Sequence, residues 1–202
     1  MSNPPVLAAF IRARQFVPTP RVSYDDGPVA IQNPSQGLLY QIWRARYVSD
    51  TVYLVAPNHT ESAFFKRRCI ESISLSFDQN GRPLLTYLIA GNLYLYWHHT
   101  ITQKYEHTLI DTQVTSHQVC LDIRTRLGIL DSQVVLGYTK NNNLYYVLQA
   151  DRYMVPYLIA LGVNGYLIQI GMSQQHRFQF LVEANEPGVY TETFPWGEVY
   201  AL

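Results

Sequence analysis

The histidines are the residues of this sequence whose type and spacing most suggest a metal site. His98 and His99 are adjacent, and His107, His117 and His176 lie further along the chain. Neighbouring residues of a strand point to opposite faces, whereas a zinc ion needs ligands that converge on one point. We therefore expect no metal-binding residues, and we assign these histidines to solvent or to hydrogen bonds.

The acidic residues suggest a second chemistry, the hydrolysis of sugars. That reaction needs two carboxyl groups about 5 to 10 Å apart, but the aspartates are scattered and most lie in turns, where Asp bonds its own backbone. They are Asp78, Asp111, Asp122, Asp131 and Asp151. The motifs of serine hydrolases, phosphate-binding loops, zinc proteases and dithiol oxidoreductases do not occur in the sequence. The sequence predicts no catalytic residue, no cofactor and no enzyme activity.

Tyrosine is the residue type that is most over-represented. The chain contains 16 tyrosines, while charged residues make up only 15% of it, and such surfaces occur at protein interfaces and on sugar-binding faces. We predict an interface or ligand patch formed by Tyr94, Tyr96, Trp97, Tyr145, Tyr146, Arg152 and Tyr153. For each ring two interpretations stay open. The ring either forms a cross-strand pair, which stabilises a sheet by about 0.2 to 1 kcal/mol, or is exposed and stacks on a sugar.

The charge balance excludes several classes of partner. Fifteen basic residues match fifteen acidic ones, so no net field attracts nucleic acid or an anionic membrane. No apolar stretch has the length of a membrane span, and no secretion signal precedes the first apolar run. We expect no nucleic-acid partner, no membrane insertion and assembly in the cytoplasm. Cys69 and Cys120 are expected to be reduced, and a pairing between them stays open.

Prolines divide the chain into two parts. Six of the eleven prolines fall within the first 36 residues, which disfavours regular helix there, and the apolar residues between them favour an extended arm over a flexible tail. After residue 36, short β-rich runs alternate with turn residues, a pattern typical of sandwiches, barrels and propellers. We predict an extended arm over residues 1–36 and an all-β domain over residues 37–202.

The best-defined element is an antiparallel meander with strands at 73–77, 84–88 and 93–97. Part of it is repeated 51 residues later, where Tyr87, Asn92, Leu93 and Tyr94 recur as Tyr138, Asn143, Leu144 and Tyr145. A weaker copy lies at 171–181. Segment 43–55 has a similar pattern of aromatic and polar residues, but its register relative to the other copies is not clear. Such repeats suit the blades of a β-propeller. Their uneven spacing keeps a β-sandwich open as the alternative.

The chain resembles small structural proteins encoded among the tail and tail-tip genes of tailed bacteriophages. The resemblance covers residues 70 to 182 and is carried by Asp122–Arg124, Asp131–Tyr138, Asn143–Tyr146, Gln149–Tyr153 and Gln169–Met172. It implies a place at the distal tail or between the tail and its fibres, several copies in the virion, and no catalysis. The partners that it implies are other tail proteins and further copies of the chain.

Two functions follow as expectations. The first is a virion structural protein that acts by protein–protein assembly, with the proline-rich arm on a neighbouring subunit. The alternative is a receptor-binding module that recognises a saccharide or pilus on the host surface, which would need exposed Tyr and Trp rings gathered in one patch.

Overall fold

The fold is built entirely from β-strands in the part of the chain that can be described. The computed structural model describes residues 29–31, 42–78, 80–121, 134–163, 165–172, 178–184 and 197–201. These ranges contain β-strands and no helix, and most strand pairs are antiparallel. The prediction of an all-β antiparallel fold is confirmed.

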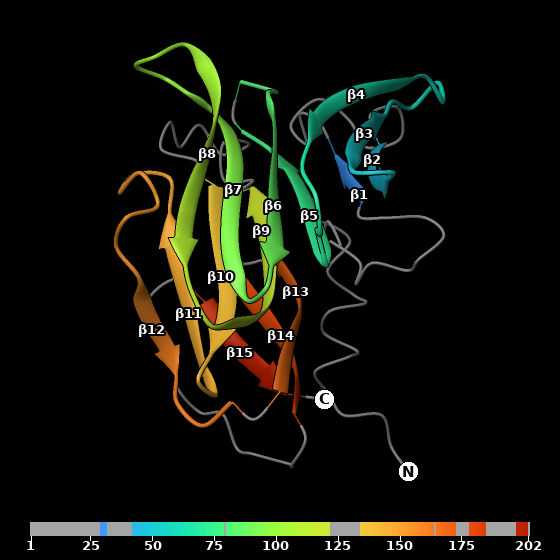
Figure 1. The fold of residues 1–202 in the computed structure, drawn as a ribbon. Coiled ribbons are helices and arrows are strands. Elements are labelled where there is room, and N and C mark those ends of the chain that lie inside the picture. Colours follow the sequence, from blue (N-terminus) through green and yellow to red (C-terminus); the bar gives the residue numbers. More distant parts are fainter. Residues whose placement is uncertain are drawn as a thin grey trace.

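The strands form four small sheets in chain order (Figure 1). The first sheet contains β1 Val29–Ile31, β2 Ile42–Val48, β3 Thr51–Val55 and β4 Glu61–Lys66. The second contains β5 Ser72–Phe77, β6 Pro83–Ile89, β7 Asn92–His99 and β8 Lys104–Asp111. The third contains β9 Val114–Leu121, β10 Val134–Lys140, β11 Asn143–Leu148 and β12 Tyr157–Ala160. The fourth contains β13 Gly165–Met172, β14 Phe178–Ala184 and β15 Gly197–Ala201.

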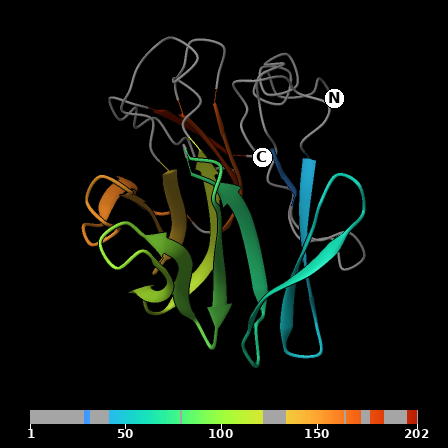
Figure 2. The ribbon, with the colours of Figure 1, turned by 90° about the horizontal axis from the view of Figure 1, so that it is seen from above.

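Successive sheets pack on each other through their first strands. β1 lies against β5, β5 against β9, and β9 against β13. The view from above shows the first sheet beside the second and the third on the other side of the second (Figure 2). Hydrophobic clusters fill the three spaces between consecutive sheets, with Phe65, Trp97 and Phe180 among their largest members. The four sheets therefore pack one on the next in chain order.

The second and third strands of the first three sheets are joined by the same two-residue turn. The turns occupy residues 49–50, 90–91 and 141–142, and all six residues have positive φ values between 48° and 72°. Two consecutive left-handed residues define a type I′ turn, whose twist matches that of the strands it joins. The predicted meander is confirmed, and the outer strand β8 extends it to four strands.

A stacked cross-strand pair occupies the same position after each of these turns. The third pair counted from the turn is Arg46 with Tyr53, Tyr87 with Tyr94, and Tyr138 with Tyr145. The two tyrosine pairs stack with ring centroids 5.2 and 5.6 Å apart, and the guanidinium of the first pair lies 5.8 Å from its ring. A register shift against the fourth strand occurs just before the tyrosine of the third strand in all three sheets. The 51-residue repeat is therefore structural, and segment 43–55 is its earlier copy.

The proposed copy at 171–181 does not fit this scheme. It falls on β13 and β14, which are the first and second strands of their sheet, whereas residues 137–147 lie on the second and third strands of theirs. In addition, β15 pairs with β14 in parallel. The alignment was wrong by one strand because alternating aromatic and polar residues look the same in any meander.

Only a small part of the predicted arm can be placed. Val29–Ile31 forms β1 and pairs with β2, so these three residues belong to the first sheet. The rest of residues 1–36 lies outside the described residues, as do 122–124 and 131–133 of the segments that carry the phage resemblance.

Gly137 marks a close approach between the third and fourth sheets. A Cβ atom at this position of β10 would lie 2.7 Å from Ile170 Cδ1 and 3.0 Å from Phe180 Cε1. We expect Gly137→Val to lower the free energy of unfolding by about 1–3 kcal/mol through overpacking, as measured by chemical denaturation. Leu158→Val on the exposed outer strand is the control and should change it by less than about 0.5 kcal/mol. Equal effects would contradict the close packing of β10 on the fourth sheet.

Candidate functional site

Three members of the predicted aromatic patch lie inside the protein. Trp97 is 6% exposed and its Nε1 donates to Thr108 Oγ1 at 2.9 Å. Tyr153 is 1% exposed and lies edge-on to the Trp97 ring, with centroids 5.3 Å apart. Tyr146 is also buried. The prediction of a surface patch was wrong for these residues, because strands between two packed sheets bury both of their faces.

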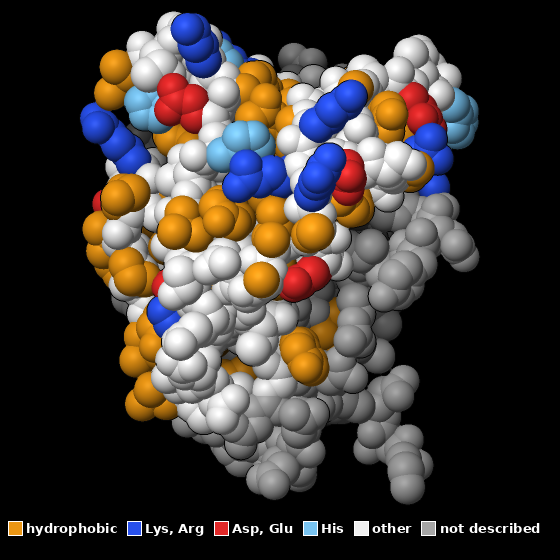
Figure 3. Space-filling view, viewed as in Figure 1, with side chains coloured by type: hydrophobic (Ala, Val, Ile, Leu, Met, Phe, Trp, Pro, Cys, Tyr) orange, Lys and Arg blue, Asp and Glu red, His pale blue; other side chains and the backbone are white. Residues whose placement is uncertain are grey.

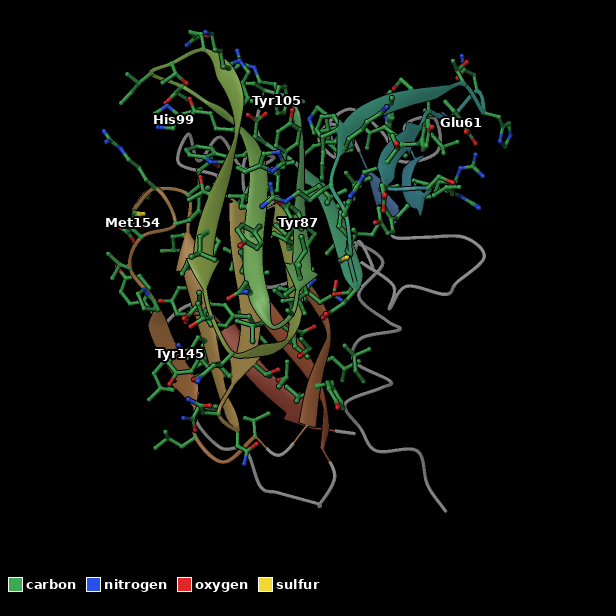
Figure 4. All side chains as sticks on the ribbon, viewed as in Figure 1. Glu61, Tyr87, His99, Tyr105, Tyr145 and Met154 are labelled. Carbon is green, nitrogen blue, oxygen red and sulfur yellow. The ribbon has the colours of Figure 1, made fainter. Side chains whose placement is uncertain are left out.

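The other members of the predicted patch are not brought together. Tyr94 and Tyr96 pack against the cluster between the first and second sheets, and Tyr145 packs against the cluster between the second and third. Arg152 is exposed in the turn after β11. Figure 4 shows Tyr145 at the opposite end of the sheets from Tyr105, which belongs to the same ring cluster as Tyr96. Among the described residues, these aromatic side chains mainly form the core or pack against it.

A cavity lined by polar and apolar residues lies where the first strands of three sheets meet. Its volume is about 330 Å³, and it is lined by residues 71–73 beside and within β5, residues 115–118 of β9 and residues 166–168 of β13. Hydroxyl, imidazole and amide groups contribute to its wall. We call it the axial pocket.

His117 is the central group of the axial pocket. Its Nε2 lies 2.9 Å from Ser72 Oγ, and its Nδ1 lies 2.8 Å from Thr86 Oγ1. Thr86 Oγ1 also donates to the backbone oxygen of Ser74 at 3.5 Å. We therefore assign the ring proton to Nδ1, which donates to Thr86, and Nε2 then accepts from Ser72. These bonds tie the second sheet to the third.

The Ser72–His117 pair has the geometry of a nucleophile and its base but lacks the electrostatics. In hydrolases a carboxylate accepts the second ring proton and stabilises the imidazolium that forms. Here a threonine occupies that place, and burial lowers the pKa of His117 to about 3. The ring cannot take up a proton near neutral pH, so the geometry supports a polar tie between sheets rather than a general base.

Gln118 is the second polar group of the pocket wall. Its Oε1 accepts from Ser74 Oγ at 3.0 Å, and Ser74 Oγ accepts from Val119 N at 3.2 Å. Within the described part of the chain, the Gln118 amide nitrogen donates to no protein group, although the residue is only 7% exposed. Sequence reasoning missed this site because its partners are 44 and 45 residues apart and no local motif joins them.

The other candidate residues have separate structural partners. Arg82 Nη1 donates to His98 Nδ1 at 2.8 Å, and His99 Nδ1 accepts from Thr102 N at 3.3 Å. The described residues contain no group of three His, Cys, Asp or Glu side chains able to hold a metal ion. Cys69 is exposed and Cys120 is buried, and no disulfide joins them. The described residues contain no helix that is long and apolar enough to cross a membrane.

Two buried tyrosines differ in whether the hydroxyl has a partner. Tyr138 donates to Asp111 Oδ2 at 2.9 Å, whereas the Tyr153 hydroxyl is buried without a hydrogen-bond partner in the described structure. We expect Tyr138→Phe to cost about 1–3 kcal/mol of unfolding free energy, since a bond to a charged group is lost. Tyr153→Phe removes an unsatisfied group and should be neutral or stabilising by up to about 1 kcal/mol. Thermal unfolding of both variants tests this, and a larger loss for Tyr153→Phe would contradict it.

Comparisons with known proteins assign the chain to no family. No family model matches the sequence, and no curated protein and no solved structure matches it. The function must therefore be argued from the residues, sheets and surfaces of the chain itself.

Proposed function

We propose that this chain is a structural protein of a tailed-bacteriophage virion, at the tail tip or between the tail and its fibres. It acts by binding copies of itself and other tail proteins rather than by catalysis. The sequence resemblance supports the place in the virion. The surface of the outer strand β12 supports the mode of action, and it is the observation that carries the proposal.

The outer strands of the first three sheets differ in charge. β4 carries Glu61 and Lys66, and β8 carries Lys104, Glu106 and Asp111. Charged side chains on an edge strand oppose pairing with a further strand. β12 has none, and no Asp, Glu, Lys or Arg occurs between Arg152 and Arg177 in the sequence. The edge of the third sheet is therefore the one without this protection.

The same edge exposes apolar side chains. Met154 is 69% exposed, Leu158 48% and Leu161 61%, and Val155 is exposed beside them. Figure 3 shows hydrophobic side chains along the edge of the molecule that β12 forms, and Figure 4 places Met154 at that edge. Apolar groups concentrated along one edge mark a surface that is covered in an assembly.

We assign the partner of the β12 edge to a second copy of the chain. β12 carries no charge and has β11 as its one strand neighbour in the described part of the chain, so its outer side can pair with an identical strand related by a two-fold axis. A charged partner would gain nothing at this edge, because the edge offers no complementary charge. The edges of β4 and β8, which carry charged side chains, are left for polar contacts with other tail proteins or with solvent.

Self-association in solution tests the mode of action. Leu158→Lys is expected to shift the full chain toward monomer by tenfold or more in dissociation constant, since it places a charge in an apolar contact. The matched control is Leu109→Lys, which changes a residue of β8 that is 50% exposed. Sedimentation velocity measures both. A wild-type chain that stays monomeric, or equal effects of the two variants, would contradict the proposal.

The place in the virion needs a separate test. Mass spectrometry of phage particles purified by density gradient should detect the chain in several copies per particle. Particles without the chain would exclude a virion structural protein, whatever the chain does in solution.

The axial pocket favours the second candidate, a module that recognises a saccharide on the host surface. The pocket offers hydroxyl, imidazole and amide groups and one carboxylate beside a partly exposed tyrosine, Tyr166. The tyrosine and tryptophan patch that this candidate was first expected to use does not form.

A further inference from the structure

We propose that the axial pocket between β5, β9 and β13 binds one ring of a neutral sugar. This site is distinct from the β12 edge, and the proposal does not depend on how the chain assembles. It rests on the charge of the pocket wall, on an amide group without a partner, and on an aromatic ring at the rim.

The charge of the wall excludes anionic ligands. The lining residues include one carboxylate, Glu71, and no lysine or arginine. His117 stays neutral because burial lowers its pKa. A phosphate, a sulfate or an acidic sugar would meet a carboxylate with no cation beside it. The ligand is therefore not an anion.

The polar groups of the wall match the hydroxyls of a sugar. The Gln118 amide nitrogen carries two hydrogens and has no protein acceptor in the described structure, although the residue is more than nine-tenths buried. Ser72 Oγ uses its hydrogen on His117 and keeps lone pairs for a ligand donor. One oxygen of Glu71 accepts from Ala90 N at 2.8 Å, which leaves the other oxygen as an acceptor. A hydroxyl donates and accepts at once, so it satisfies both kinds of group.

The rim supplies an apolar face. Tyr166 on β13 is 47% exposed at the pocket, and Ile168 lines it beside this residue. A sugar ring presents C–H groups on one face and hydroxyls at its edge, so it can pack on an aromatic ring while its edge bonds to the wall. The volume of about 330 Å³ lies at the lower end of small-molecule pockets, which span roughly 300 to 1,000 Å³. The space suits one ring rather than a chain of several.

Saturation-transfer NMR on the full chain tests the site. The probes are the methyl glycosides of glucose, galactose and mannose, together with N-acetylglucosamine, and the charged probes are inorganic phosphate and sialic acid. We expect saturable binding of at least one neutral probe and none of the charged ones. Tyr166→Ala should weaken that binding tenfold or more, the effect of about 1.4 kcal/mol of lost contact.

Two further variants separate the site from the fold. Glu71→Gln keeps the acceptor for Ala90 and removes the charge, and it should weaken neutral-sugar binding several-fold. Leu161→Ala, an exposed residue away from the pocket, should leave the affinity within about twofold. The proposal is overturned if no neutral probe binds up to about 50 mM, well above the range of even weak specific binding. It is also overturned if only charged probes bind, or if Tyr166→Ala binds as the wild type does.

Discussion

Trp97→Ala lowers the free energy of unfolding by about 3–5 kcal/mol, the cost of removing a large buried aromatic side chain. The ring fills the space between the second and third sheets, where it contacts Tyr153 and donates to Thr108. Its removal leaves a cavity and an unpaired threonine hydroxyl. Urea denaturation followed by circular dichroism measures the loss.

The exposed residue Met154 provides the control for this variant. Met154→Ala should change the unfolding free energy by less than about 0.5 kcal/mol, since the side chain is 69% exposed. A folded, fully stable Trp97→Ala protein would show that the ring is not part of the core. Because the expected loss is large, Trp97→Ala cannot separate receptor binding from folding, and Tyr166→Ala is the suitable variant for that purpose.

Stability falls steeply in mild acid because of His117. The folded-state pKa of about 3 lies below the ordinary value of 6.5, so below pH 6.5 the unfolded chain takes up a proton that the folded chain refuses. The contribution is fully present above pH 6.5 and is lost as the pH falls toward 3, at about 1.4 kcal/mol per pH unit. Between pH 6.5 and pH 4.5 this single site should cost roughly 2–3 kcal/mol.

His117→Gln isolates this effect from the other titrating groups. Burial also lowers the pKa of His107, and this residue adds to the acid sensitivity of both proteins equally. Most carboxylates titrate below pH 4.5, outside the window. The unfolding free energy of wild type, measured at half-unit steps, should therefore fall more steeply than that of His117→Gln by about 1.4 kcal/mol per unit. Parallel curves would mean that His117 is not buried as a neutral ring.

Local sequence patterns predicted the strands and hairpins well, but they predicted poorly which strands of different sheets pack together. The hairpin of β5 and β6 and the repeat of Tyr87 and Asn92 at Tyr138 and Asn143 follow from alternation and turn residues, which act within a dozen positions. The copy at 43–55 had no recognisable register because Arg46 replaces the first tyrosine of the pair. A guanidinium over a ring serves the same role as two stacked rings, and residue identity does not show this.

The candidate site could not be predicted from sequence. Alternation places every second ring on one face, but in a sheet packed on both sides that face is also buried, as Trp97 and Tyr153 show. The axial pocket joins Ser72, His117 and Gln118 from strands of different sheets. Only the packing of β5 on β9 brings them together, and no local spacing encodes that contact. The one sequence signal that could have indicated the pocket is the occurrence of Ser, His and Gln among the apolar residues of strand β9.

A density map of the intact phage particle tests the central claim most directly. The proposal predicts several copies of the chain at the distal tail or the fibre junction, with β12 and Met154 buried against an identical strand of a neighbouring copy. A map in which the chain occurs in the particle as a single isolated copy, with the β12 edge facing solvent, would contradict it.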